Sequence, residues 1–147
     1  MPEFPDIELD WRPCEAHPRP EEYGRHSDLC ARGMYFAMDF GIDVNEYHHR
    51  MYQAAINMKD KVNVDDPAAI AGVVADLCDA AQFAEALKSE KYADTLDQSN
   101  TLVWDVHDCP AVPSFRIAQS GELLKSVPGV GVTKEALEAF IREGLKK

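Results

Sequence analysis

Hydrophobic and polar positions alternate near the start of the chain, in the segment PDIELDWR at residues 5–12. Ile7, Leu9 and Trp11 would lie on one face of an extended segment, since successive side chains of a strand point to opposite faces. The pattern therefore predicts a half-buried strand. The next segment, CEAHPRPEEYGRH, is rich in proline and charge and predicts a loop.

From residue 27 to about residue 107 the apolar positions recur at helical spacing, which predicts a series of helices. Residues that cap helix starts stand where these helices should begin, at Ser27, Asp43, Asp66 and Asp79. Asp43 and Glu46 also have the spacing of a capping box, and Pro67 suits the first turn after Asp66. The third helix is expected to face the core with Ile70, Val73, Val74, Leu77 and Cys78.

The pattern changes after residue 107. Residues 113–118 and 123–127 predict two strands joined by a turn into a hairpin, and Thr133 is expected to cap a final helix. A lone strand is not stable by itself, so residues 5–12 are expected to pair with this hairpin. The expected fold class is α/β, with a small sheet of about three strands and helices packed on it.

The composition indicates one globular domain and excludes two classes of partner. The chain has 147 residues, which suits a single domain. Its formal net charge of -11 repels phosphate backbones and anionic lipids, so neither nucleic acid nor a membrane surface is an expected partner. We find no signal peptide or transmembrane pattern and expect a cytoplasmic protein, whose four cysteines would be reduced.

Four residues near the predicted loop have types and spacings that suit a zinc site: Cys14, His17, His26 and Cys30. Thiolates and imidazoles in this number would fill a tetrahedron around the metal. The alternative is that Cys14 ends a strand while Cys30 faces the helical core. We favour that alternative, because Cys30 lies one turn into a predicted helix that needs Ser27 as its cap. The leading hypothesis therefore includes no metal.

Cys109 is a candidate for a catalytic thiol, because it follows His107 and Asp108 and precedes a proline-rich turn. A neighbouring histidine is one way in which proteins activate a thiol. The predicted position is at a helix C-terminus, however, where the helix dipole disfavours a thiolate. The favoured interpretation is a partly buried side chain that behaves as a small hydrophobe.

The order of the elements resembles the DsbA-like family of the thioredoxin superfamily over about residues 5–145. The segment AVPSFRI resembles the cis-proline loop, and GVGVTKEALEAFI resembles the glycine turn and final helix. The block of residues 27–107, including YHHRMYQA, is similar to the all-helical insertion of that family, and IELDWRPCEAHP resembles the strand after its first helix. The resemblance implies a partial thioredoxin-like domain over residues 1–147, with an insertion at 27–107 and the loop, hairpin and last helix at 108–147.

This resemblance implies thiol-disulfide exchange with protein thiols, but no two cysteines here are spaced C-x-x-C. The expected first strand and C-x-x-C helix would precede residue 5. Three interpretations remain open: a fragment with a start further upstream, a short form that binds without redox chemistry, and a homodimer that completes the sheet. A protein with these residues alone is expected to have little or no oxidoreductase activity.

The resemblance also names a binding site at Val112 and Pro113. The bond between them is expected to be cis, and Val112 would offer backbone groups to an extended peptide by strand addition. The alternative is a plain turn proline. The expected partners are protein thiols, a peptide or a small thiol compound, and no cofactor is expected apart from the alternative of bound glutathione.

Overall fold

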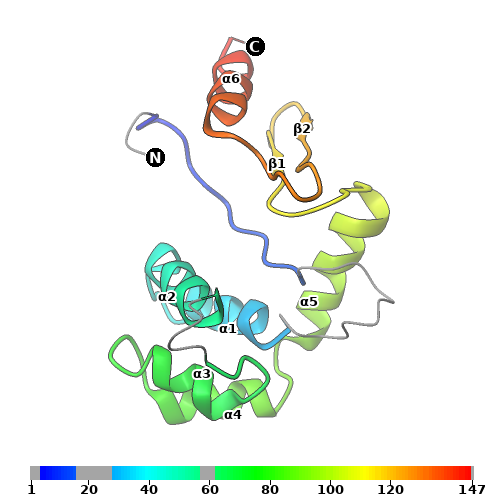
Figure 1. Cartoon of the computed structure of the whole chain (residues 1–147). Coiled ribbons are helices and arrows are strands. Elements are labelled where there is room, and N and C mark those ends of the chain that lie inside the picture. Colours follow the sequence, from blue (N-terminus) through cyan, green and yellow to red (C-terminus); the bar gives the residue numbers. More distant parts are fainter. Residues whose placement is uncertain (1–3, 16–27, 57–61, 147) are drawn as a thin grey trace.

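A computed structural model describes residues 4–15, 28–56 and 62–146 of the chain (Figure 1). Its helices are α1 (Asp28–Asp39), α2 (Val44–Ile56), α3 (Pro67–Val73), α4 (Ala80–Lys88), α5 (Ala93–Asn100) and α6 (Lys134–Gly144). A π-helix, η1 (Thr101–Val106), continues α5 directly. The strands are β1 (Phe115–Arg116) and β2 (Leu123–Leu124), which pair antiparallel. The described residues therefore form a mixed α/β structure in which helices predominate.

Several helix starts agree with the capping residues that the sequence indicates. The side chain of Asp79 accepts from the N–H of Gln82, and that of Thr133 accepts from the N–H of Ala136. Asp43 accepts from two N–H groups at the start of α2, and Asp66 caps α3 with a proline in its first turn. These predictions are confirmed. Ser27, the predicted cap of α1, lies outside the described residues.

Helices α1 to α4 enclose the hydrophobic core, as the helical block in Figure 1 shows. Its fully buried side chains include Phe36, Tyr47, Ile70, Phe83, Leu87 and Leu96. Gly33 allows the closest approach, because a Cβ built on it would come within 2.7 Å of the Phe83 ring and closer still to the Tyr47 hydroxyl. The absence of a side chain at this position therefore lets α1, α2 and α4 meet.

The third helix is shorter than its apolar stripe predicts. It ends at Val73, and the chain then turns, with the N–H groups of Leu77 and Cys78 both bonded to the carbonyl of Val74. Gly72 and two successive β-branched residues are weak helix formers, which explains the early end. Val74 still enters the core, whereas Cys78 is only half-buried against it.

The prediction of a strand at residues 5–12 is wrong. Residues 7–15 run extended but join no ladder, so the sheet has two strands where about three were expected. Leu9 is 45% exposed, and Trp11 packs toward α2, where its ring lies 5.1 Å from that of His48. The alternation of apolar and polar residues correctly predicted an extended segment. The segment does not pair with the hairpin, and Trp11 contacts a helix.

The hairpin and α6 form a second group of elements, away from the helical block in Figure 1. The predicted strands are shortened to two residues each, and α6 has no fully buried residue. Its predicted apolar face is half-buried at Leu137, Phe140 and Ile141, and Leu145 is 62% exposed. The N-terminal segment runs between the two groups and contacts both.

No helix in the described residues is long and apolar enough to cross a membrane.

Candidate functional site

The candidate site begins where η1 ends. Asp108 adopts a positive φ of 48°, a left-handed conformation that aspartate tolerates better than most residues. This turn brings the N–H of Cys109 back onto the carbonyl of Val103, at 3.0 Å. The bond gives a partner to a carbonyl near the helix end, after a left-handed residue of the kind that commonly ends helices. As a result Cys109 is 7% exposed and lies against the helix that precedes it.

The proline loop follows immediately. The bond between Val112 and Pro113 is cis, as expected from the sequence. Ser114 ties the loop together, because its hydroxyl donates to the carbonyl of Ala111 at 2.9 Å and accepts from the N–H of Ser126 at 2.9 Å. The loop is thus held on the hairpin by one serine side chain.

Val112 leaves its backbone open within this loop. Neither its N–H nor its carbonyl has a hydrogen-bond partner in the described part of the chain. The side chain is half-buried, and Pro113 beside it is exposed. Lys125 adds a cation at the same loop, where its ammonium donates to the carbonyl of Asp108 at 3.0 Å. Among the described residues the loop therefore holds one backbone donor and one backbone acceptor without a hydrogen bond, and the ammonium of Lys125 lies at its start.

The N-terminal segment reaches the same helix from the other side. The N–H of Glu15 donates to the Asn100 Oδ1 atom at 2.8 Å, and Asn100 Nδ2 donates back to the Glu15 carboxylate at 2.6 Å. Both residues are at most 5% exposed. The hydroxyl of Tyr35, in α1, donates a hydrogen bond to the carbonyl of Pro13 at 2.8 Å and so holds the residues just before Glu15. These three bonds fix Cys14, which stands between Pro13 and Glu15.

Cys14 and Cys109 are electrostatic neighbours. Burial, with smaller contributions from the charges of Cys109 and Glu15, raises the pKa of Cys14 to about 12. Burial is also the main cause of the raised pKa of Tyr35, and the charge of Cys14 contributes to the same increase. A thiol with such a pKa is almost entirely protonated at neutral pH and is a slow nucleophile. The site therefore holds two thiols but no activated thiolate at Cys14.

The proposed zinc ligands can be placed only in part. Cys30 packs against the helical core, as the favoured interpretation expects, and burial raises its pKa to about 11. His17 and His26 lie outside the described residues. Within the described ranges no three histidine, cysteine or acidic side chains lie close enough to hold a metal. Of the four proposed ligands only Cys14 and Cys30 lie in the described residues, so the zinc site stays a prediction.

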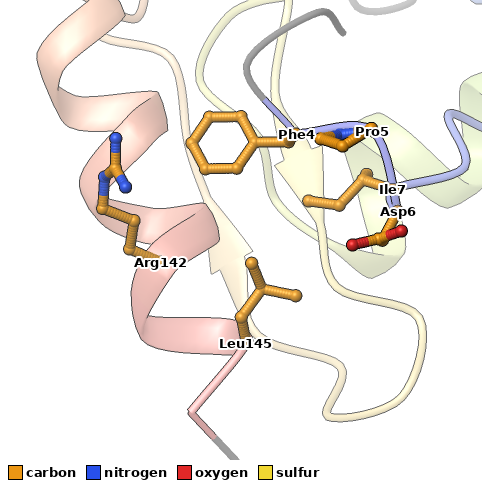
Figure 2. A pocket seen from close by; sticks show the side chains of 6 residues that line it. All are labelled: Phe4, Pro5, Asp6, Ile7, Arg142 and Leu145. Carbon is orange, nitrogen blue, oxygen red and sulfur yellow. The ribbon is translucent and has the colours of Figure 1, made fainter.

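A separate cavity of about 280 Å³ lies between the N-terminal segment and α6 (Figure 2). Its walls are mainly apolar and come from Phe4, Pro5, Ile7 and Leu145, with Asp6 and Arg142 at its edge. The guanidinium of Arg142 lies 5.1 Å from the centroid of the Phe4 ring, a cation–π contact. We interpret these contacts as the attachment of the N-terminal segment to α6, apart from the proline loop.

Two residues of the site escaped sequence reasoning. Asn100 and Tyr35 both read as ordinary helical positions, and their partners lie far away in the sequence. One signal was available for Asn100, since asparagine is a poor helix former whose side chain often makes a hydrogen bond when it stands inside a helix.

Comparisons of the chain with protein-family models, with curated proteins and with solved structures give no match.

Proposed function

We propose that the chain is a DsbA-like protein of thioredoxin type that binds an extended peptide beside Val112 and Pro113. The observation that carries the proposal is the open backbone of Val112, whose N–H and carbonyl have no partner in the described part of the chain. An extended peptide uses such groups by strand addition, in which main-chain hydrogen bonds supply affinity. A peptide bound there would pass close to the thiol of Cys109, at the start of the same loop.

The order of elements around the loop supports the same proposal. A helical block, the proline loop, a hairpin, a turn and α6 follow one another in the order that the resemblance implies. Gly129 and Gly131 have φ of 76° and 83° in the turn before α6, a conformation that favours glycine. The proposal therefore rests on two observations: the order of the elements, and the Val112 N–H and carbonyl that make no hydrogen bond within the described residues.

The chain should not turn over disulfides at an appreciable rate. Thiol-disulfide exchange needs a thiolate, and helix N-termini favour that charge, whereas Cys109 follows the C-terminal end of η1. In an insulin reduction assay with dithiothreitol, we expect a rate equal to that of the reductant alone. A rate like that of thioredoxin would contradict the proposal, and Cys109→Ser would then identify the responsible thiol.

Peptide binding should depend on the N–H of Val112. With carboxymethylated insulin B chain as the probe, Val112→Pro should weaken binding about tenfold, since it removes one main-chain donor. Titration of the amide NMR signals gives the dissociation constant, and the signals of Val112 and Ser114 should move first. The matched control is Val130→Ala, a change at a residue that is 72% exposed and lies outside the loop. Equal weakening by both variants, or no binding by the parent chain, would overturn the proposal.

A small thiol compound such as glutathione is the second candidate ligand. Lys125 favours it, because its ammonium at the loop would pair with a ligand carboxylate. The same NMR titration distinguishes the two ligands. Glutathione binding that Lys125→Ala abolishes, with no response to the peptide, would select the second candidate.

A further inference from the structure

The cavity between the N-terminal segment and α6 is lined by two opposite charges that do not pair with each other (Figure 2). Asp6 comes from the segment and Arg142 from α6. The Asp6 carboxylate makes no hydrogen bond or ion pair with any described residue. The guanidinium of Arg142 lies 4.0 Å from the Glu138 carboxylate, which is too far for a hydrogen bond, and its N–H groups have no acceptor within the described ranges. Both charges are therefore available to a ligand without the loss of an internal hydrogen bond.

The same cavity leaves apolar surface open to the solvent. Leu145 is 62% exposed and Ile7 is half-buried. Figure 2 shows both side chains pointing into the space between the segment and α6. Phe4 supplies a fixed wall, because this residue is only 6% exposed and its ring contacts Arg142. A ligand whose hydrocarbon part covers Leu145 and Ile7 would gain the free energy of removing apolar surface from water.

The size and charge of the cavity narrow the class of ligand. Its volume of about 280 Å³ lies just below the range of about 300–1,000 Å³ that is usual for drug-sized ligands, so the ligand must be small. A simple anion would pair with Arg142 but would be repelled by Asp6 and by the net charge of -11. A simple cation would pair with Asp6 and be repelled by Arg142. A zwitterion has no net charge and satisfies both groups.

We propose that this cavity binds a free α-amino acid with an apolar side chain, such as phenylalanine or leucine. The ligand carboxylate accepts hydrogen bonds from the guanidinium of Arg142, whose planar set of donors suits a carboxylate. The ligand ammonium donates to the carboxylate of Asp6, and the ligand side chain covers Leu145 and Ile7. Each part of the ligand thus meets a group that the fold leaves without a partner in the described part of the chain.

The first test compares four probes by titration of the amide NMR signals of the full chain. L-phenylalanine should bind with a dissociation constant on the order of 1 mM and move the signals of Ile7 and Leu145 most. 3-Phenylpropanoate lacks the ammonium, 2-phenylethylamine lacks the carboxylate, and glycine lacks the apolar side chain. Each of these three should bind at least about tenfold more weakly.

The second test removes each charge beside a matched control. Arg142→Met and Asp6→Asn should each weaken phenylalanine binding about tenfold. Arg116→Met and Glu8→Gln should leave it unchanged, because both residues are exposed and neither lines the cavity. Arg142 and Asp6 are themselves exposed, so their variants should fold, and the temperature of thermal unfolding checks this.

A third variant tests the apolar wall. Leu145→Ala should weaken phenylalanine binding about fivefold and leave the unfolding temperature nearly unchanged, since the side chain is 62% exposed. The proposal is wrong if phenylalanine does not bind, or if 3-phenylpropanoate or 2-phenylethylamine binds as tightly. Signal changes at Val112 and Ser114 in place of Ile7 and Leu145 would also contradict it. The outcome does not depend on peptide binding, because the cavity lies apart from the proline loop.

Discussion

Replacement of Arg32 by methionine should cost about 3–5 kcal/mol of the free energy of unfolding, the largest stability effect we expect in this protein. Arg32 is 4% exposed in α1. Its guanidinium lies 3.0 Å from the Asp28 carboxylate and donates to the carbonyl of Leu87 at 3.0 Å. Methionine retains much of the volume but removes the guanidinium that pairs with the buried Asp28 carboxylate. Urea unfolding followed by circular dichroism measures the loss.

Two further variants separate the charge effect from packing. Asp28→Asn combined with Arg32→Met should regain a substantial part of the lost stability, because a neutral amide loses less than a buried carboxylate when the guanidinium is removed. Arg12→Met is the exposed comparison, since Arg12 and Asp10 form an ion pair whose side chains are 69% and 70% exposed. That change should cost under about 1 kcal/mol. If Arg32→Met costs no more than Arg12→Met, the buried pair does not stabilise the fold.

Asn100→Ala should destabilise the chain by about 3 kcal/mol and release the N-terminal segment from the helix. The variant removes both bonds to Glu15 and leaves a buried carboxylate and a buried N–H without that partner. Unfolding in urea gives the stability. Hydrogen exchange at Cys14 and Glu15 reports the release of the segment, and it should rise strongly. Gln98→Ala is the control, as Gln98 is an exposed residue of the same helix.

Asn100→Asp gives a sharper form of this test. The new carboxylate still accepts from the N–H of Glu15, but it repels the Glu15 carboxylate where the amide donated a bond. Repulsion and burial both favour the protonated form of the new group in the folded state. The variant should therefore be least stable at neutral pH and recover as the pH falls, opposite to the usual behaviour of paired carboxylates. A pH-independent loss would show that shape, not charge, determines the contact.

Local features of the fold were predictable because their partners lie within a few residues. Asp43, Asp66, Asp79 and Thr133 each cap a helix, and every such bond spans two or three residues. Gly41 ends α1 with a φ of 66°, which its lack of a side chain permits. The cis bond at Pro113 was also expected from the sequence. For these elements the nearest neighbours in the chain supply the stabilising contacts.

Contacts between distant segments were not predictable in the same way. The alternation of Ile7, Leu9 and Trp11 indicated an extended backbone, but not whether a strand or a helix would lie beside it. Nothing in the sequence pairs Glu15 with Asn100 or the Tyr35 hydroxyl with the carbonyl of Pro13. The single hypothesis that joined distant cysteines linked Cys14 to Cys30, which instead packs toward the helical core.

The sequence by itself determined the helices, their caps, the hairpin and the proline loop, since each depends on propensity and on bonds between close neighbours. Only the tertiary structure decided where the N-terminal segment lies and to which helix residue its end is bonded. The reason is physical. The spacing of apolar residues along the sequence specifies the face of an element on which a side chain lies, but the partner of that side chain depends on how the faces of all elements pack together. The Glu15–Asn100 contact arises at that level.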